Sequence, residues 1–236
     1  MSVQKFFTSD GVPASTPSNV TDLNLDITND DLYYSVDTTG SGDWKKVPQG
    51  VTDLTIDGAI ITGNYRTKYI DASEMIARTT SGAASGSEEA TTNKQMNSYF
   101  DFDAASDEFV QYVFNMPDEY DGGTFKCKFY WKDAATPGSG DVVWGIQAVA
   151  VSNDGAIDSS FGTAKTVTDT YIASGDVHIT SATSAVTIAG NPALADLTYF
   201  QIYRDADNGS DTYTQDARLL GVAIQYKETT TAPVIW

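Results

Sequence analysis

The feature that most constrains the fold is a strict alternation of side chains over residues 125–132. Every second position is apolar, and these four residues are Phe125, Cys127, Phe129 and Trp131. The positions between them hold three lysines and Tyr130. Because successive side chains of a strand point to opposite faces, the pattern predicts a half-buried β-strand.

A second strand is predicted over residues 142–151, after a loop that contains Pro137, Gly138 and Gly140. One row of this stretch is entirely apolar, and valines make much of the other row apolar as well. A strand that is apolar on both faces is typical of the middle of a buried sheet. The two stretches together predict the centre of a sheet-on-sheet core.

Further strand patterns recur at residues 96–102, 108–116, 165–170, 176–180, 184–188, 198–204 and 218–226, with turn residues between them. No βαβ spacing and no internal repeat is present. The expected fold class is therefore all-β, an antiparallel β-sandwich of the jelly-roll type. Residues 71–76 predict one helical turn, and residues 78–94, rich in Ser, Thr, Gly and Glu, predict a long exposed loop.

The chain is expected to divide into three parts. Residues 1–64 are predicted to form an N-terminal arm with a small β region, residues 65–228 the sandwich, and residues 229–236 a C-terminal tail. Phe6 and Phe7 in the arm would either dock on a neighbouring surface or fold back on their own domain. Tyr33, Tyr34 and Trp44, in a predicted hairpin, would pack inward, meet another protein or stack on sugars. We take these five aromatic residues as interface candidates.

The charge excludes some partners. The chain of 236 residues has 14 Lys and Arg against 32 Asp and Glu, a formal net charge of −18. Such a surface repels phosphate backbones and anionic lipids, so neither nucleic acid nor a membrane is an expected partner. The sequence shows no membrane span and no secretory signal peptide, so we expect the protein to stay in the cytoplasm of the cell that makes it, or to leave by lysis or as part of a particle.

The sequence offers little for catalysis, and we expect no enzyme. A lone histidine, His178, and a lone cysteine, Cys127, nearly exclude zinc, and Cys127 reads as a buried apolar residue. Carboxylate pairs such as Asp101 with Asp103 and Glu119 with Asp121 are numerous enough to arise by chance.

We expect no cofactor. The weak exception is calcium, because oxygen ligands at alternate positions around a glycine resemble a calcium loop. That pattern occurs in DADNGSD, where the candidate ligands around Gly209 are Asp205, Asp207 and Asp211.

Residues 67–228 resemble a domain found in structural proteins of tailed bacteriophages. The residues that carry the resemblance are Trp131, the pair Trp144-Gly145, the DGAID–FGTA connection and the closing YRDA and DARLLGV segments. The front segment, TDLNLDITNDDLYYSV with WKKV, is similar to attachment hairpins at the start of some virion-bound proteins. These are structural rather than catalytic markers, so the resemblance implies a fold and a setting.

The first hypothesis is a non-enzymatic virion protein, a capsid decoration (cement) or head-fibre component. Its N-terminal region would bind the major capsid protein or other virion proteins, and the sandwich would self-associate, as a homotrimer. The alternative is a tail-fibre carbohydrate- or receptor-binding module, since fold alone does not decide function. A glycan-degrading enzyme is a third hypothesis, which requires two facing carboxyl groups in a cleft.

Overall fold

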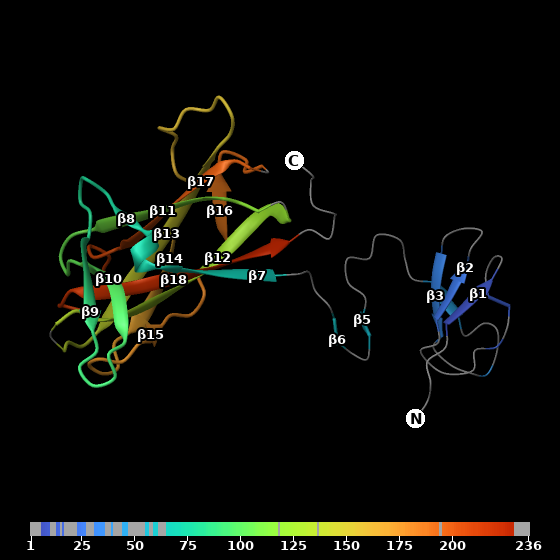
Figure 1. Cartoon of the computed structure of the whole chain (residues 1–236), viewed down its shortest axis with the longest axis horizontal. Helices are drawn as coiled ribbons and strands as arrows, with labels where there is room; N and C mark the ends of the chain where they lie inside the picture. The colour runs from blue at the N-terminus through green and yellow to red at the C-terminus, as the bar shows by residue number, and fades with distance from the viewer. Residues whose placement is uncertain are drawn as a thin grey trace. The chain divides into compact units, whose positions relative to one another are not determined.

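The computed structural model describes residues 65–228 except 118, 136 and 194, and, before them, residues 6–9, 13, 14, 16, 23–26, 31–35, 39, 44–46, 55, 56, 59 and 60. The chain forms two compact units, Met1–Thr62 and Gly63–Trp236. The predicted tail, residues 229–236, lies outside the described residues. Each unit is described by itself below (Figure 1).

The first unit contains a four-stranded sheet in the order β1-β2-β3-β4. Its strands are β1 (Phe6–Ser9), β2 (Leu23–Asp26), β3 (Asp31–Ser35) and β4 (Trp44–Lys46). The predicted hairpin is present as the antiparallel pair β3–β4, and β1 pairs parallel to β2. The arm thus adds a strand to its own unit. A short pair, β5 (Thr55–Ile56) and β6 (Ala59–Ile60), follows.

The second unit is an all-β sandwich of two layers, which confirms the expected fold class. The first layer holds β7 (Tyr65–Asp71), β9 (Ala84–Glu89), β10 (Met96–Phe102), β12 (Tyr120–Asp133), β15 (His178–Ile179) and β18 (Ala217–Glu228). The second layer holds β8 (Ile76–Ala77), β11 (Glu108–Asn115), β13 (Asp141–Val151), β14 (Lys165–Thr170) and β17 (Leu197–Arg204). All pairings within each layer are antiparallel.

The two layers are joined at one edge by β16 (Val186–Ala189). This strand pairs antiparallel with β12 through Val186 and Thr187, and parallel with β13 through Ile188 and Ala189. At the opposite edge, β8 of the second layer and β9 of the first end the strand order. Among the described strands, β16 is therefore the one that pairs with both layers.

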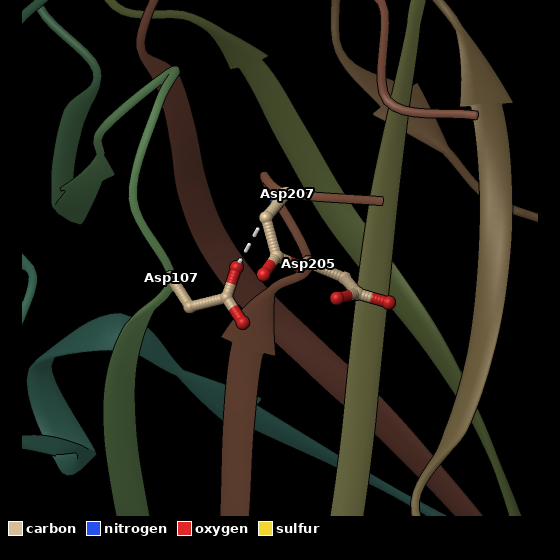
Figure 2. A group of neighbouring side chains, drawn as sticks. All are labelled: Asp107, Asp205 and Asp207. Carbon is tan, nitrogen blue, oxygen red and sulfur yellow. Dashed lines mark hydrogen bonds between the residues drawn. The ribbon is translucent and has the colours of Figure 1, made fainter. Parts of the chain in front are cut away.

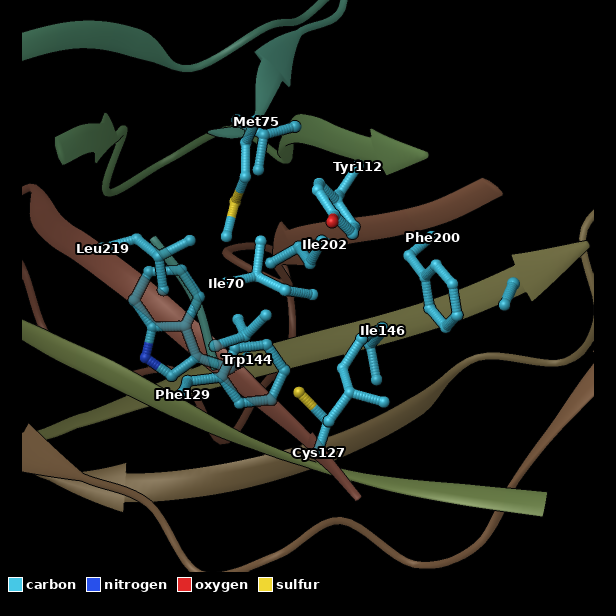
Figure 3. Close-up of a cluster of buried hydrophobic side chains, with 14 of the residues drawn as sticks. Ile70, Met75, Tyr112, Cys127, Phe129, Trp144, Ile146, Phe200, Ile202 and Leu219 are labelled. Atoms are coloured by element: carbon cyan, nitrogen blue, oxygen red, sulfur yellow. The ribbon is translucent and has the colours of Figure 1, made fainter. Parts of the chain in front are cut away.

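The core lies between the layers and is rich in aromatic rings (Figure 3). The predicted inward row of β12 is confirmed, because Phe125, Cys127, Phe129 and Trp131 are all buried. In the middle of the core the Phe129 ring stacks on Trp144 of β13, with ring centroids 5.7 Å apart. The predicted central position of β13 is also confirmed, since it pairs with β14, β16 and β17.

One buried ion pair fixes the turn after β17. Arg204 and Asp211 are both inaccessible, and the Arg204 guanidinium donates to both oxygens of the Asp211 carboxylate at 2.7 and 2.9 Å. The guanidinium also donates to the backbone carbonyls of Gln215 and Tyr213. A buried arginine needs such full pairing, because an isolated charge inside a protein is strongly unfavourable.

Two local predictions have different outcomes. The helical turn is present as the 3₁₀ helix η2 (Ala72–Glu74), capped by the Asp71 carboxylate. The predicted loop at residues 78–94 is wrong, since β9 lies within it and pairs along its length with β10. An edge strand buries few side chains and can be polar, so a search for alternating hydrophobic residues does not detect it. Among the described residues, no helix is long and apolar enough to cross a membrane.

Candidate functional site

The outward face of the first layer carries the most distinctive group of surface side chains. On β12 the exposed Lys126 and Lys128 alternate with buried residues, and Tyr130 follows them, half-buried. The registers place Lys126 opposite Gln225 of β18, and Lys128 opposite Ala223. β7 continues the same rows on the other side of β18, with Thr67 and Tyr69. Three adjacent strands thus contribute to one surface.

A shallow groove of about 220 Å³ lies on this surface. Its residues are Thr67, Lys126, Cys127, Lys128, Tyr130, Ala182, Ala223 and Gln225. The small side chain of Ala223 separates the larger residues of β7 and β12. The amide of Gln225 donates to the Thr67 hydroxyl at 3.1 Å, which fixes a polar pair in the groove.

Two tyrosines are fixed at one end of the groove. The rings of Tyr69 and Tyr130 meet edge to face, with centroids 5.1 Å apart and an interplanar angle of 88°. The Tyr69 ring lies over Gly221, where an added Cβ would stand 2.4 Å from the phenol oxygen. The Tyr69 hydroxyl donates to the Leu220 carbonyl at 3.3 Å. Burial raises the pKa of the Tyr69 phenol, and the neighbouring Asp71 and Tyr130 add to the rise.

The surface extends along the strands beyond the groove. Lys227 shares the outward row of β18 with Gln225, and Tyr65 stands opposite Lys227 on β7. Tyr65 is 58% exposed and Tyr69 is 46% exposed. We name this surface the basic strip and define it as Thr67, Gln225, three lysines (Lys126, Lys128, Lys227) and three tyrosines (Tyr65, Tyr69, Tyr130). Within the described part of the chain, none of the three lysines has an acidic partner within ion-pair distance.

The other end of the same face is electrostatically neutralised. Lys132 pairs with Glu88 of β9 at 3.0 Å, and Arg218 of β18 pairs with the other oxygen of that carboxylate at 2.6 Å. Arg218 also forms a two-point pair with Asp101 of β10, at 2.7 and 2.8 Å. Its guanidinium lies 3.4 Å from the centroid of the Tyr99 ring. We call this group the paired end.

A second hollow, of about 470 Å³, opens at the edge between the layers. It lies between η2 and β8 on one side and β9 and β10 on the other. Four serines and an apolar set line most of it, namely Ser73, Ser85, Ser87, Ser98, Met75, Ile76 and Phe100. Ile76 is 74% exposed there. This edge groove carries hydroxyl groups but no charged side chain among its lining residues.

The acidic turn predicted as a calcium candidate is arranged differently from the expectation (Figure 2). Asp205 and Asp207 lie close together, but their third neighbour is Asp107, from the loop before β11. The expected third ligand, Asp211, is instead buried in the pair with Arg204. The set of residues was therefore wrong, because Asp107 lies about a hundred positions away and only the fold brings it near. Calcium at this turn stays a prediction.

The environment of Asp107 opposes its ionisation. Burial raises the pKa of the Asp107 carboxyl, and the negative charges of Asp207 and Asp205 raise it further. Hydrogen bonds from the backbone N–H groups of Ala206, at 2.8 Å, and Asp207, at 3.4 Å, act in the opposite direction without cancelling the rise.

The five interface candidates are distributed unevenly. Tyr33 and Trp44 are buried, and Tyr34 is 39% exposed. Phe6 and Phe7 lie in β1, and their side chains are outside the described part of the structure. An interface role of this unit stays a prediction, and Tyr34 is the accessible aromatic residue among Tyr33, Tyr34 and Trp44. The burial of Trp44 also removes it as a residue on which a sugar could stack.

The remaining reactive groups have structural environments. His178 is buried between the rings of Trp131 and Tyr171, with centroids 4.4 and 5.5 Å away. Cys127 is buried, and burial raises the pKa of its thiol far above the ordinary value. A neutral buried thiol is a poor nucleophile.

The acidic pairs considered for glycan hydrolysis have local partners. Asp101 binds Arg218, whereas Asp103 accepts from the Ala105 N–H and Asp121 from the Gly123 N–H. Such contacts are typical of ion pairs and turns. The expectation of no enzymatic activity stays a prediction.

Reasoning from the sequence missed the basic strip. The lysines of β12 were visible as the polar row of a strand, and Tyr65 and Tyr69 as strand residues. That β7 and β12 lie on either side of β18 follows only from the pairing of strands far apart in the chain. The sequence signal was the combination of lysine and tyrosine at alternate positions of residues 126–130, in a chain of net charge −18.

The chain was compared with protein families, curated proteins and solved structures. No protein-family model and no curated protein matches the sequence. Among solved structures, the chain is similar to a family 35 carbohydrate binding module from Clostridium thermocellum (TM-score 0.39, 9% identity, 67% of this chain and 97% of that chain). It is also similar to the CBM36-1 domain of a multidomain xylanase from the hindgut metagenome of Trinervitermes trinervoides (TM-score 0.36, 11% identity, 72% and 100%).

A further similar structure is a cycloisomaltooligosaccharide glucanotransferase of Paenibacillus sp., at a TM-score of 0.39 and 9% identity. The match covers 66% of this chain but spans only 18% of that enzyme. At these scores and identities the likenesses carry no argument about function. They describe the chain as similar to β-sandwich modules, and its family is not assigned.

Proposed function

We propose that the chain is a non-enzymatic structural protein of a tailed-phage particle, in which the first unit attaches the chain and the sandwich is displayed. The observation that carries this proposal is the division into two compact units. The described core of the second unit is formed entirely by residues 70–226, so the sandwich has its own source of stability. The first unit can then bind another protein without lowering the stability of the sandwich.

The residues that carry the phage resemblance support the same proposal by their positions. Trp131 and Trp144 are buried against each other, with ring centroids 6.3 Å apart. Gly145 leaves room for the Tyr203 ring, which an added Cβ would approach to 2.3 Å. The YRDA segment supplies Arg204 of the buried ion pair. Residues with these roles preserve the fold, so the resemblance rests on structural positions.

The proposal is tested with particles produced without this protein. Labelled full-length chain is added back beside a truncated chain that lacks residues 1–62, and imaging counts the copies on each particle. We expect the truncated chain to fold, by circular dichroism and cooperative unfolding, and to be absent from the particles. Incorporation of the truncated chain at full occupancy would contradict the attachment role.

Self-association is the second part of the proposal. Copies on a particle would bury the exposed aliphatic side chains of the sandwich, which include Ile157, Ile172 and Ile179. Analytical ultracentrifugation of the full chain should give a trimer. A chain that stays monomeric at high micromolar concentration, and on the particle, would remove self-association from the proposal.

A carbohydrate- or receptor-binding module is the second candidate, and the basic strip is the observation that favours it. The strip combines exposed tyrosine rings with a hydroxyl, an amide and unpaired lysines. A surface with these groups can bind a polar ligand. This candidate predicts glycan binding that Tyr130→Ala weakens. A glycan array on which the wild-type chain binds nothing would set it aside.

A further inference from the structure

We propose that the basic strip binds an acidic polysaccharide, whose carboxylate or sulfate groups contact Lys126, Lys128 and Lys227 while its sugar rings lie against the tyrosines. This inference rests on the second candidate function and names its class of ligand. It is carried by the groove, by the lysines that lack acidic partners, and by the tyrosines beside them.

The contrast in ion pairing along one face is the first argument. The chain has more than twice as many acids as bases. At the paired end, Lys132 and Arg218 share Glu88, and Arg218 binds Asp101 as well. On the basic strip, Lys126 and Lys128 face the same solvent from the same strand and form no ion pair with any described acid. A positive surface in so acidic a chain complements an anionic ligand.

The spacing of the cations is the second argument. Lys126 and Lys128 are two residues apart on β12, so their Cα atoms are about 6.5–7 Å apart. Lys227 lies on the neighbouring strand, beyond Gln225 in the same row. The three charges therefore follow a line that runs along the strands and steps from β12 to β18. Such a line suits a polymer that carries repeated charges better than a single small anion.

The neutral groups decide between a glycan and an acidic peptide. One common way to recognise an extended peptide is through the backbone of a free strand edge. Here the groove lies over β18 and β12, and the backbone of β18 is paired on both sides, with β7 and β12. Recognition must then come from side chains. Tyrosine rings next to a hydroxyl and an amide suit sugar rings and their hydroxyl groups.

The experiment measures binding of the full chain to four polymers, by affinity electrophoresis and by calorimetry. The probes are polygalacturonate, dextran sulfate, unmodified dextran and poly-glutamate. We expect the wild-type chain to bind at least one of the two acidic polysaccharides. Because a hydrogen bond to a charged group is a strong one, Lys126→Ala with Lys128→Ala should weaken binding by on the order of tenfold per lysine.

Matched variants separate a site from general charge effects. Lys94→Ala with Lys165→Ala removes the same number of charges from the β9–β10 turn and from β14, and we expect it to leave binding unchanged. Lys126→Arg with Lys128→Arg should retain most of the affinity. Tyr130→Ala should weaken binding to the polysaccharide. The dependence of binding on salt, which measures the electrostatic part of the interaction, should stay the same.

Each result decides the question. Binding of an acidic polysaccharide that is lost in the Lys126/Lys128 variant and kept in the Lys94/Lys165 variant supports the inference. Equal binding of dextran would overturn it while leaving the second candidate function standing. Binding of poly-glutamate as tight as that of the polysaccharides would assign the strip to an acidic protein partner. Binding of none of the four would overturn the inference, and with an empty glycan array the second candidate as well.

Discussion

The two faces of β12 are formed by alternate residues of one strand, and they differ in what their side chains contact. The inward face is a row of fully buried apolar side chains, and each of them contacts the opposite layer or a neighbour in the core. The outward face is a row of lysines and a tyrosine, of which Lys132 is paired and Lys126 and Lys128 are not. Alternate positions along one strand therefore have opposite roles.

The difference shows where stability and binding are separable in this molecule. The inward row can change only with loss of packing, because protein interiors are close to the density of organic crystals. Lys126 and Lys128 are exposed and form no ion pair with a described residue, so the fold does not require them. A surface that the fold does not require is free to serve recognition.

The largest expected effect comes from the inward face. Phe129→Ala should lower the free energy of unfolding by about 3–5 kcal/mol, since it removes a ring that stacks on Trp144 and leaves a cavity. Its neighbour on the outward face provides the control, because Lys128→Ala should change the free energy by no more than about 0.5 kcal/mol. Urea unfolding measures both. Similar losses in the two variants would show that the faces are not separable.

Ion pairs sharpen the same comparison. Asp211→Ala leaves Arg204 charged and buried, and should cost about 3–5 kcal/mol. Asp101→Ala on the outward face should cost about 1 kcal/mol, because Asp101 is partly exposed and the buried Arg218 keeps its pair with Glu88. Thermal unfolding at fixed pH is the measurement. An Asp101 variant as unstable as the Asp211 variant would place the paired end among the essential parts of the fold.

The smallest expected effect concerns the acidic turn and depends on pH. The folded protein raises the pKa of Asp107, so the ionised carboxylate destabilises the fold at neutral pH. Asp107→Asn keeps an oxygen for the two backbone N–H groups and should raise the melting temperature by about 1–2 °C at pH 7 in the presence of a chelator. The gain should shrink as the pH falls through the raised pKa of Asp107 and vanish about one pH unit below the ordinary value of about 3.9, where the carboxyl is protonated in both states. A gain that persists at low pH would require another cause.

Much of the sandwich could be predicted from the sequence because burial has a period of two in a strand. Residues 165–170 were predicted with the bounds of β14, and residues 96–102 with those of β10. The strand β9 could not be predicted, because its residues ASGSEE lack an apolar row and are held by hydrogen bonds to β10. A pattern of hydrophobicity predicts nothing where a strand is held by backbone hydrogen bonds rather than by burial of its side chains.

The candidate sites were less predictable for a related reason. The basic strip requires β7, β18 and β12 to be neighbours, and β7 is separated from β18 by about 150 positions in the chain. The acidic group requires Asp107 to lie beside Asp205, which no local spacing indicates. Tyr33 and Trp44 were expected at an interface because they are aromatic, yet the packing of a small sheet also uses aromatic residues.

The strand β16 gives the sandwich a closed side and an open side. Because β16 bonds to both layers, the layers cannot slide or separate along that edge without breaking its ladder. Opening of the molecule short of unfolding should therefore be easier at the edge of β8 and β9, where β9 pairs with β10 alone among the described strands and the serine-lined groove lies nearby. Amide protons of β9 should exchange with solvent sooner than those of β12 and β13. Local opening would then separate the layers at the β9 edge, while the edge joined by β16 stays closed.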